Sequence, residues 1–112
     1  MAGRRHSYKV EDEHEFEEKV LHSKEPVMVG FFDKSDQTSK IALFRAQQVV
    51  DEMEGKVELA KVFVDELSEL SEKYGIKQTP VIDIFQNGEQ KGQMSGVHDL
   101  VDLRRFVGNT IE

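Results

Sequence analysis

The sequence contains no cysteine and no tryptophan, and only two of its 112 residues are proline. Without cysteine the chain has no disulfide, no thiolate metal ligand and no thiol nucleophile, and its redox compartment cannot be read from the sequence. No apolar run is long enough to cross a bilayer, and the start "MAGRRHSYK" lacks the apolar stretch of a secretory signal. The sequence therefore predicts no membrane association.

The remaining composition is that of an acidic globular protein. Hydrophobic residues make up 38% of the chain, charged residues 33%, and the formal net charge is −7. An acidic surface repels phosphate backbones, so we expect no nucleic-acid partner. The length suits one core, and we expect a flexible segment over residues 1–6 and a single domain over 7–112.

The first half of the chain has the pattern of two strand–helix units. Residues 7–12 alternate like a half-buried strand, and Asp12 is placed to cap a helix that reaches about Ser23. The apolar run 27–32 is typical of a strand buried on both faces, and a second helix is expected over 38–54. Four residues at helical spacing are predicted to form its buried stripe: Ile41, Phe44, Val49 and Met53.

The second half adds three strands and two helices. We expect a central strand over 56–66, a short helix over 67–75 and a closing amphipathic helix over 99–112. Between these helices, residues 79–96 form a predicted hairpin that turns at "NG" (87–88). The order β-α-β-α-β-α-β-β-α predicts an α/β fold: one mixed central sheet of four to five strands, flanked by helices on both faces.

Two stretches of sequence, in this order, resemble the thioredoxin family, and its mitochondrial type most of all. The stretch "KEPVMVGFF" resembles the strand before the family's active site. The stretch "KVELAKVFVDELSELSEKYGIKQTPVIDIFQNGE" resembles the family's segment from the third strand to the hairpin. The resemblance runs from Tyr8 to Val107. It implies the thioredoxin fold, with a cis peptide bond before Pro80 and a structural glycine at Gly96.

The sequence differs from the family at the residues that carry out the family's chemistry. The family's Trp-Cys-Gly-Pro-Cys-Lys motif falls on "SDQTSK", so its attacking cysteine becomes aspartate and its resolving cysteine becomes serine. We take as vestigial active-site positions Ser35, Asp36, Gln37, Thr38 and Ser39. The family's buried aspartate falls on Gly30, its helix-kinking proline on Phe44, and the lysine partner of the aspartate persists as Lys61.

These losses favour a binding role over catalysis. Thiol–disulfide exchange needs a thiolate that attacks sulfur, and neither serine nor aspartate can replace it. We therefore expect a redox-inactive thioredoxin-like protein, not an enzyme and without a cofactor, that serves as a protein-binding, chaperone-like or scaffold module. The expected partner is a protein or an extended peptide segment. The residues predicted to contact it are Phe32, Asp36, Ser39, Thr79, Pro80, Gly96 and Val97.

Other functions stay open at this level. The chain could descend from, or be an engineered variant of, a mitochondrial-type thiol-disulfide oxidoreductase whose cysteines were replaced. An acidic calcium-buffering domain, similar to those of calsequestrin, is a third interpretation. By default we expect a monomer, with a dimer as the alternative, in the cytoplasm or the mitochondrial matrix.

Two groups of polar residues invite a site assignment. Asp83 interrupts the apolar strand "VIDIF", either as an outward-facing residue or as a buried acid paired with Lys61. The four histidines (His6, His14, His22 and His98) have unrelated spacings, which favours surface positions over metal ligands. We therefore predict no metal site.

Overall fold

Strand β2 (Val27–Phe32) lies at the centre of a five-stranded sheet, and all six of its residues are buried. The computed structural model describes residues 6–111. The strand order is β1-β3-β2-β4-β5, in which β1 (Ser7–Lys9) and β3 (Glu58–Phe63) run parallel to β2. Strand β4 (Val81–Gln86) pairs antiparallel with β2, and β5 (Glu89–Ser95) pairs antiparallel with β4. The predicted mixed sheet is confirmed.

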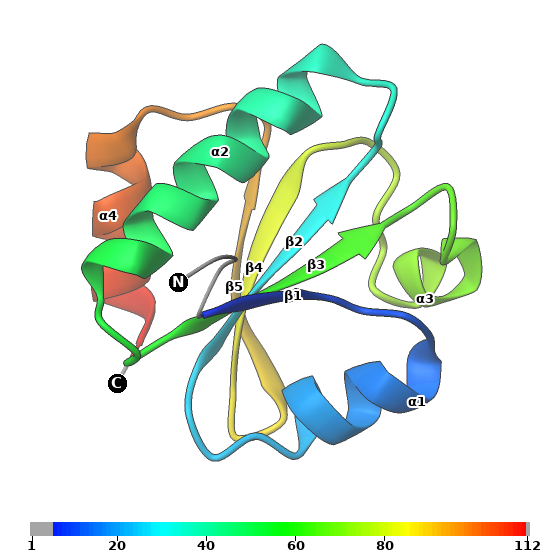
Figure 1. Ribbon diagram of the computed structural model, residues 1–112, viewed down its shortest axis with the longest axis horizontal. Coiled ribbons are helices and arrows are strands. Elements are labelled where there is room, and N and C mark those ends of the chain that lie inside the picture. Colours follow the sequence, from blue (N-terminus) through cyan, green and yellow to red (C-terminus); the bar gives the residue numbers. More distant parts are fainter. Residues whose placement is uncertain (1–5, 112) are drawn as a thin grey trace, which may run out of the picture.

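Helices cover both faces of this sheet (Figure 1). One layer consists of α2 (Gln37–Glu52) and α4 (Leu100–Thr110), whose buried residues pack with Met28, Leu59 and Ile84. The other layer consists of α1 (Glu13–Phe16), a π-helical turn η1 (Glu17–Leu21) and α3 (Ser68–Lys73). Each layer thus has its own apolar cluster, and the sheet separates the two.

Local sequence patterns account for several of the helix starts and for the hairpin turn. Asp12, Asp36 and Asp99 each accept a backbone N–H of the helix that follows, as N-caps do. Asn87 and Gly88 both have positive φ, 56° and 78°, as the tight hairpin turn between β4 and β5 requires. The first helix differs from expectation, because its second half is the π-turn η1, closed by His22 N–H donating to Glu17 O at 3.0 Å.

The predicted buried stripe of α2 is wrong at Ile41 and Phe44. The side chain of Phe44 is 65% exposed and that of Ile41 is 37% exposed. The residues that α2 buries are Ser39, Ala42, Ala46, Gln47, Val49 and Val50. Most of these are small, and small side chains let the helix axis approach the sheet, so the larger Ile41 and Phe44 lie on the solvent side. The helix is continuous through position 44, where the family's proline would fall.

Of the flexible segment predicted over residues 1–6, positions 1–5 lie outside the described residues. His6 itself is tied to the sheet, because its carbonyl accepts the N–H of Leu59 at 2.7 Å. Over residues 6–111, no helix combines the length and apolar character that a bilayer crossing needs.

Asp83 and Lys61 point to opposite faces of the sheet, so the predicted pair is wrong. In the register of the sheet, Asp83 is level with Val29 and Ala60, whereas Lys61 is level with Gly30 and Ile82. Side chains one residue apart on a strand alternate between faces. The outward-facing interpretation of Asp83 is also wrong, because the residue has no exposed surface.

Burial dominates the chemistry of the Asp83 carboxyl group. It raises the pKa of Asp83 from 3.8 to about 6, and hydrogen bonds from Gln93 and Gln90 offset only part of this rise. The amide of Gln90 donates to Asp83 Oδ2 at 2.7 Å across the hairpin. The glutamine side chains of β5 therefore cover a carboxyl group that the fold favours in its protonated form.

The Asp83→Asn variant should be more stable than the native chain at neutral pH. Because the folded-state pKa is raised, the stabilising contribution of protonated Asp83 is complete below pH 3.8 and is lost as the pH rises through about 6. We expect the two proteins to unfold alike near pH 3.8 and to differ by about 2–3 kcal/mol at pH 7. Urea unfolding across this range measures the difference, and a constant gap at every pH would contradict the assignment.

Candidate functional site

The loop between β2 and α2 is organised around the carboxylate of Asp36. This residue is extended, with φ −98° and ψ 122°, and caps α2 through a hydrogen bond from Thr38 N–H at 3.2 Å. Hydroxyl groups donate to the same carboxylate from Thr38 at 2.8 Å and from Ser39 at 3.2 Å. The residue at the position of the family's attacking cysteine is thus a helix cap with its acceptors occupied.

Asp36 also joins two loops that are far apart in the sequence. Thr79 Oγ1 lies 3.5 Å from Asp36 Oδ2, and Thr79 precedes Pro80 through a cis peptide bond, as the resemblance implied. Pro80 O in turn accepts the N–H of Gly96 at 2.9 Å. The structure therefore brings Asp36, Thr79, Pro80 and Gly96 into one connected surface, which we call the Asp36–Gly96 surface and take to include Val97.

Hydrogen bonds keep the Asp36 carboxylate ionised. They lower its pKa below the ordinary 3.8, and the hydroxyl of Thr38 makes the largest contribution. Donors stabilise the charged form of a carboxyl group more than the neutral form. The Asp36–Gly96 surface therefore carries a fixed negative charge at physiological pH.

Two of the predicted contact residues lie beneath this surface, and Pro80 has its side chain buried within it. Phe32 and Ser39 are each 1% exposed, and Pro80 is buried. Phe32 packs into the α2/α4 apolar cluster, so it can support the surface but cannot touch a partner. Ser39 points inward because α2 turns it toward the loop, where it accepts Asp33 N–H at 3.0 Å.

The accessible part of the surface is formed by other residues. Val97 is 37% exposed, Thr79 is half-buried, and Gly96 has φ +84° with open space around its missing side chain. Positive φ and the absence of a Cβ let another backbone approach Gly96 closely. Ser35 and Gln37 are exposed at the rim.

The region that corresponds to the family's active site has neither the cysteines nor the space for a buried acid. A Cβ added at Gly30 would lie 2.2 Å from Cζ of Phe32, so the Phe32 ring fills the space that an aspartate there would need. The ring is enclosed in the core and packs at 6.2 Å from Phe63. Restoring the family's aspartate therefore requires the Phe32 ring to move.

Sequence reasoning missed two features of this region. Asp33 accepts from both N–H and Oγ of Ser35, at 3.0 and 2.8 Å, which closes the loop on itself. The Asp-x-Ser spacing could have revealed this turn, because aspartate often bonds the backbone two residues on. Arg45 donates to His98 O at 3.0 Å and fixes the loop of Val97 against α2. No local sequence pattern predicts this contact.

The described residues offer no group of three or more acidic or histidine side chains placed to hold a metal ion. The hydroxyl of Ser39 accepts the N–H of Asp33 and donates to the carboxylate of Asp36. Neither partner is a histidine base. Because the sequence has no cysteine, the arrangement has no thiolate for disulfide exchange.

Comparisons with known proteins agree with this geometry. Residues 7–109 match the thioredoxin family model. A thioredoxin of Rickettsia bellii is 34% identical over 96 residues, which cover 86% of this chain and 91% of that protein. Mitochondrial thioredoxin of Bos taurus is 29% identical over 105 residues, or 94% of this chain and 63% of that protein. A mutant thioredoxin from Halobacterium salinarum has a similar structure, with a TM-score of 0.85, 20% identity and coverage of 100% and 96%.

Asp36→Ala should destabilise the protein by about 1 kcal/mol, the usual cost of losing an N-cap. Asp36→Asn should cost less, because its side-chain oxygen still accepts from Thr38. The Asp36 carboxylate stabilises the fold above pH 3.8, and this contribution is lost as the pH falls through its lowered pKa. Urea unfolding at pH 7 ranks the variants, and an alanine variant as stable as the native chain would contradict the capping role.

Proposed function

The chain belongs to the thioredoxin family, and from that premise we propose that it is a redox-inactive member that binds an extended segment of a partner protein. It would serve as a scaffold or chaperone-like module through the Asp36–Gly96 surface. The absence of cysteine removes the thiolate that disulfide exchange requires. Binding through this surface needs no sulfur.

One observation carries the proposal. The three loops that make the Asp36–Gly96 surface are joined by hydrogen bonds, from Thr79 to Asp36 and from Gly96 to Pro80. A loop held in place before binding loses less conformational entropy on binding. The surface is therefore prepared for a partner.

The accessible groups suit an extended peptide. The open backbone of Gly96 allows close approach of a second main chain, and Val97 offers an apolar contact beside it. A partner segment with an apolar side chain would gain from Val97, while Asp36 disfavours an acidic residue opposite it.

The compartment is part of the proposal. Mitochondrial relatives support the mitochondrial matrix, and bacterial relatives are equally compatible with the cytoplasm.

Substitutions on the surface should weaken binding. Peptides selected from a random display library on the immobilised native chain would be titrated against Thr79→Arg and Val97→Asp. We expect each dissociation constant to rise about tenfold or more, because each change places a charge in the contact. Val101→Asp is the matched control, since Val101 is also exposed, at 52%, but lies on α4. Selected peptides that bind all four proteins equally would contradict the proposed surface.

The alternative, a thiol-disulfide oxidoreductase whose cysteines alone were replaced, makes a different prediction. Asp36→Cys with Ser39→Cys should restore full activity if only the sulfur atoms are missing. We expect insulin reduction by this double variant to remain about 100-fold or more below that of a mitochondrial-type thioredoxin. The buried acid is also absent, and a general base contributes about that factor.

The insulin assay needs the native chain as its blank and a mitochondrial thioredoxin as its reference. Brisk reduction by the double variant would favour the engineered or recently diverged oxidoreductase over our proposal.

A further inference from the structure

A groove runs between the α1/η1 segment and α3, on the face of the sheet that α2 does not cover. It consists of two adjoining hollows, of about 260 and 360 Å³, both lined by Glu13 and Leu70. The first hollow extends along the start of α3, and the second along η1 toward Tyr74. The groove is distinct from the Asp36–Gly96 surface, since the two share no residue.

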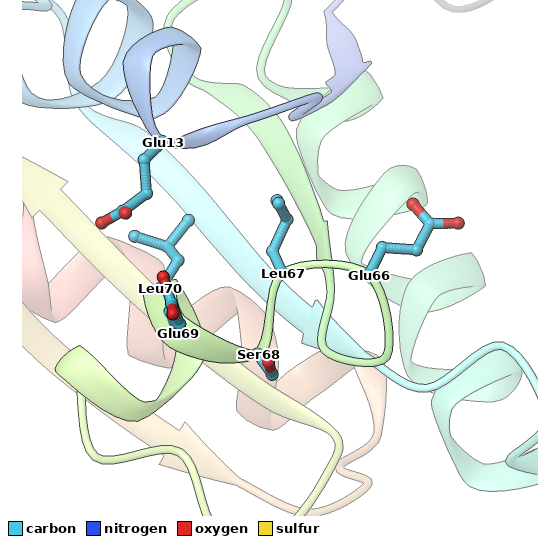
Figure 2. A pocket seen from close by; sticks show the side chains of 6 residues that line it. All are labelled: Glu13, Glu66, Leu67, Ser68, Glu69 and Leu70. Atoms are coloured by element: carbon cyan, nitrogen blue, oxygen red, sulfur yellow. The ribbon is translucent and has the colours of Figure 1, made fainter.

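The floor of the groove is apolar and firmly held. Leu67 and Leu70 point from α3 and the loop before it toward the segment that leads into α1 (Figure 2). Phe16 and Tyr74 line the second hollow, with ring centroids 5.5 Å apart, and each also packs edge-on against Phe85. Phe16 and Leu70 are each 2% exposed and support the floor from beneath, while the apolar surface that a partner can touch comes from the half-buried Leu67 and Tyr74. An apolar side chain would therefore find a formed site, because this packing is in place before binding.

The rim of the groove is acidic. Glu13, Glu17 and Glu69 line it, and Lys73 is the lysine among its lining residues. Glu66 lines it too, but its carboxylate points away in Figure 2 and pairs with Lys9 and Lys34. An apolar floor between acidic walls is complementary to a segment that carries both apolar and basic side chains.

An ion pair within the chain already places a basic side chain on this rim. Lys73 Nζ reaches from α3 to Glu13 Oε2 on α1, at 3.1 Å, and so joins the two walls of the groove. This ion pair is exposed, so it contributes little to stability and can exchange for another cation. Lys73 thus occupies the position that a basic side chain of a partner would take.

We propose that the groove between α1/η1 and α3 is a second docking site, for an amphipathic segment of another protein that carries leucine-like and lysine- or arginine-like side chains. The apolar side chains enter the two hollows, and the basic ones pair with Glu17, Glu69 and, in place of Lys73, with Glu13. The binding is independent of the peptide surface proposed above.

The probe for this site is a capped model peptide of leucine and lysine at helical spacing, titrated by fluorescence anisotropy at low and moderate salt. Glu17→Gln with Glu69→Gln should raise its dissociation constant about three- to tenfold, and added salt should narrow the difference. Glu18→Gln with Glu72→Gln is the matched control. It removes the same charge from η1 and α3 at exposed residues that line neither hollow.

A variant that is expected to bind the probe more tightly provides a second test. Lys73→Gln frees Glu13 and should tighten binding about two- to fivefold. Lys77→Gln makes the same change in net charge at an exposed lysine outside the groove and should have a smaller effect. Amide shifts in NMR spectra should concentrate at residues 13–21 and 66–74.

The proposal fails if the native chain does not bind the probe, or if the groove and control variants change affinity equally. It also fails if a peptide with glutamate in place of lysine binds as well. None of these outcomes bears on the Asp36–Gly96 surface, whose test uses other variants and other peptides.

Discussion

The candidate site depends on the hydrogen bonds that the carboxylate of Asp36 accepts. The first backbone N–H groups of a helix have no partner within the helix, and an N-cap side chain can satisfy them. Asp36 accepts from Thr38 N–H in α2 and also from hydroxyls of Thr38, Ser39 and Thr79. The same group therefore ends the loop, starts the helix and holds the loop of Pro80.

The two faces of the sheet differ in their buried polar groups. On the α2/α4 face, Gly30 stands where the family has an acid, and the ring of Phe32 fills the space. On the other face, Asp83 is fully buried beside the aromatic residues of the second cluster. The core beneath Asp36 is therefore apolar, while the opposite face holds a carboxyl group whose burial costs stability near neutral pH.

The protein thus presents two surfaces of different character. The Asp36–Gly96 surface is small, tied by hydrogen bonds and open at Gly96, which suits main-chain contact. The groove beside α3 has an apolar floor and acidic walls, which suits side-chain contact. Both surfaces rest on the same sheet, so the two segments that we propose as partners would be held at fixed positions relative to each other.

The sequence by itself determined the order of the elements, the cap at Asp12, and the turn at Asn87 and Gly88. Each of these depends on contacts within a few residues, so local patterns contain the necessary information. The resemblance to the family added the fold and the cis bond before Pro80.

Only the tertiary structure decided which side chains of those elements are buried. It exposed Ile41 and Phe44, enclosed Phe32 and Ser39, and placed Asp83 and Lys61 on opposite faces. The contact of Asp36 with Thr79 and the groove of α1 and α3 each join residues more than forty positions apart. A local pattern gives the period of a helix or strand. The direction that its side chains face follows from how the elements pack against each other.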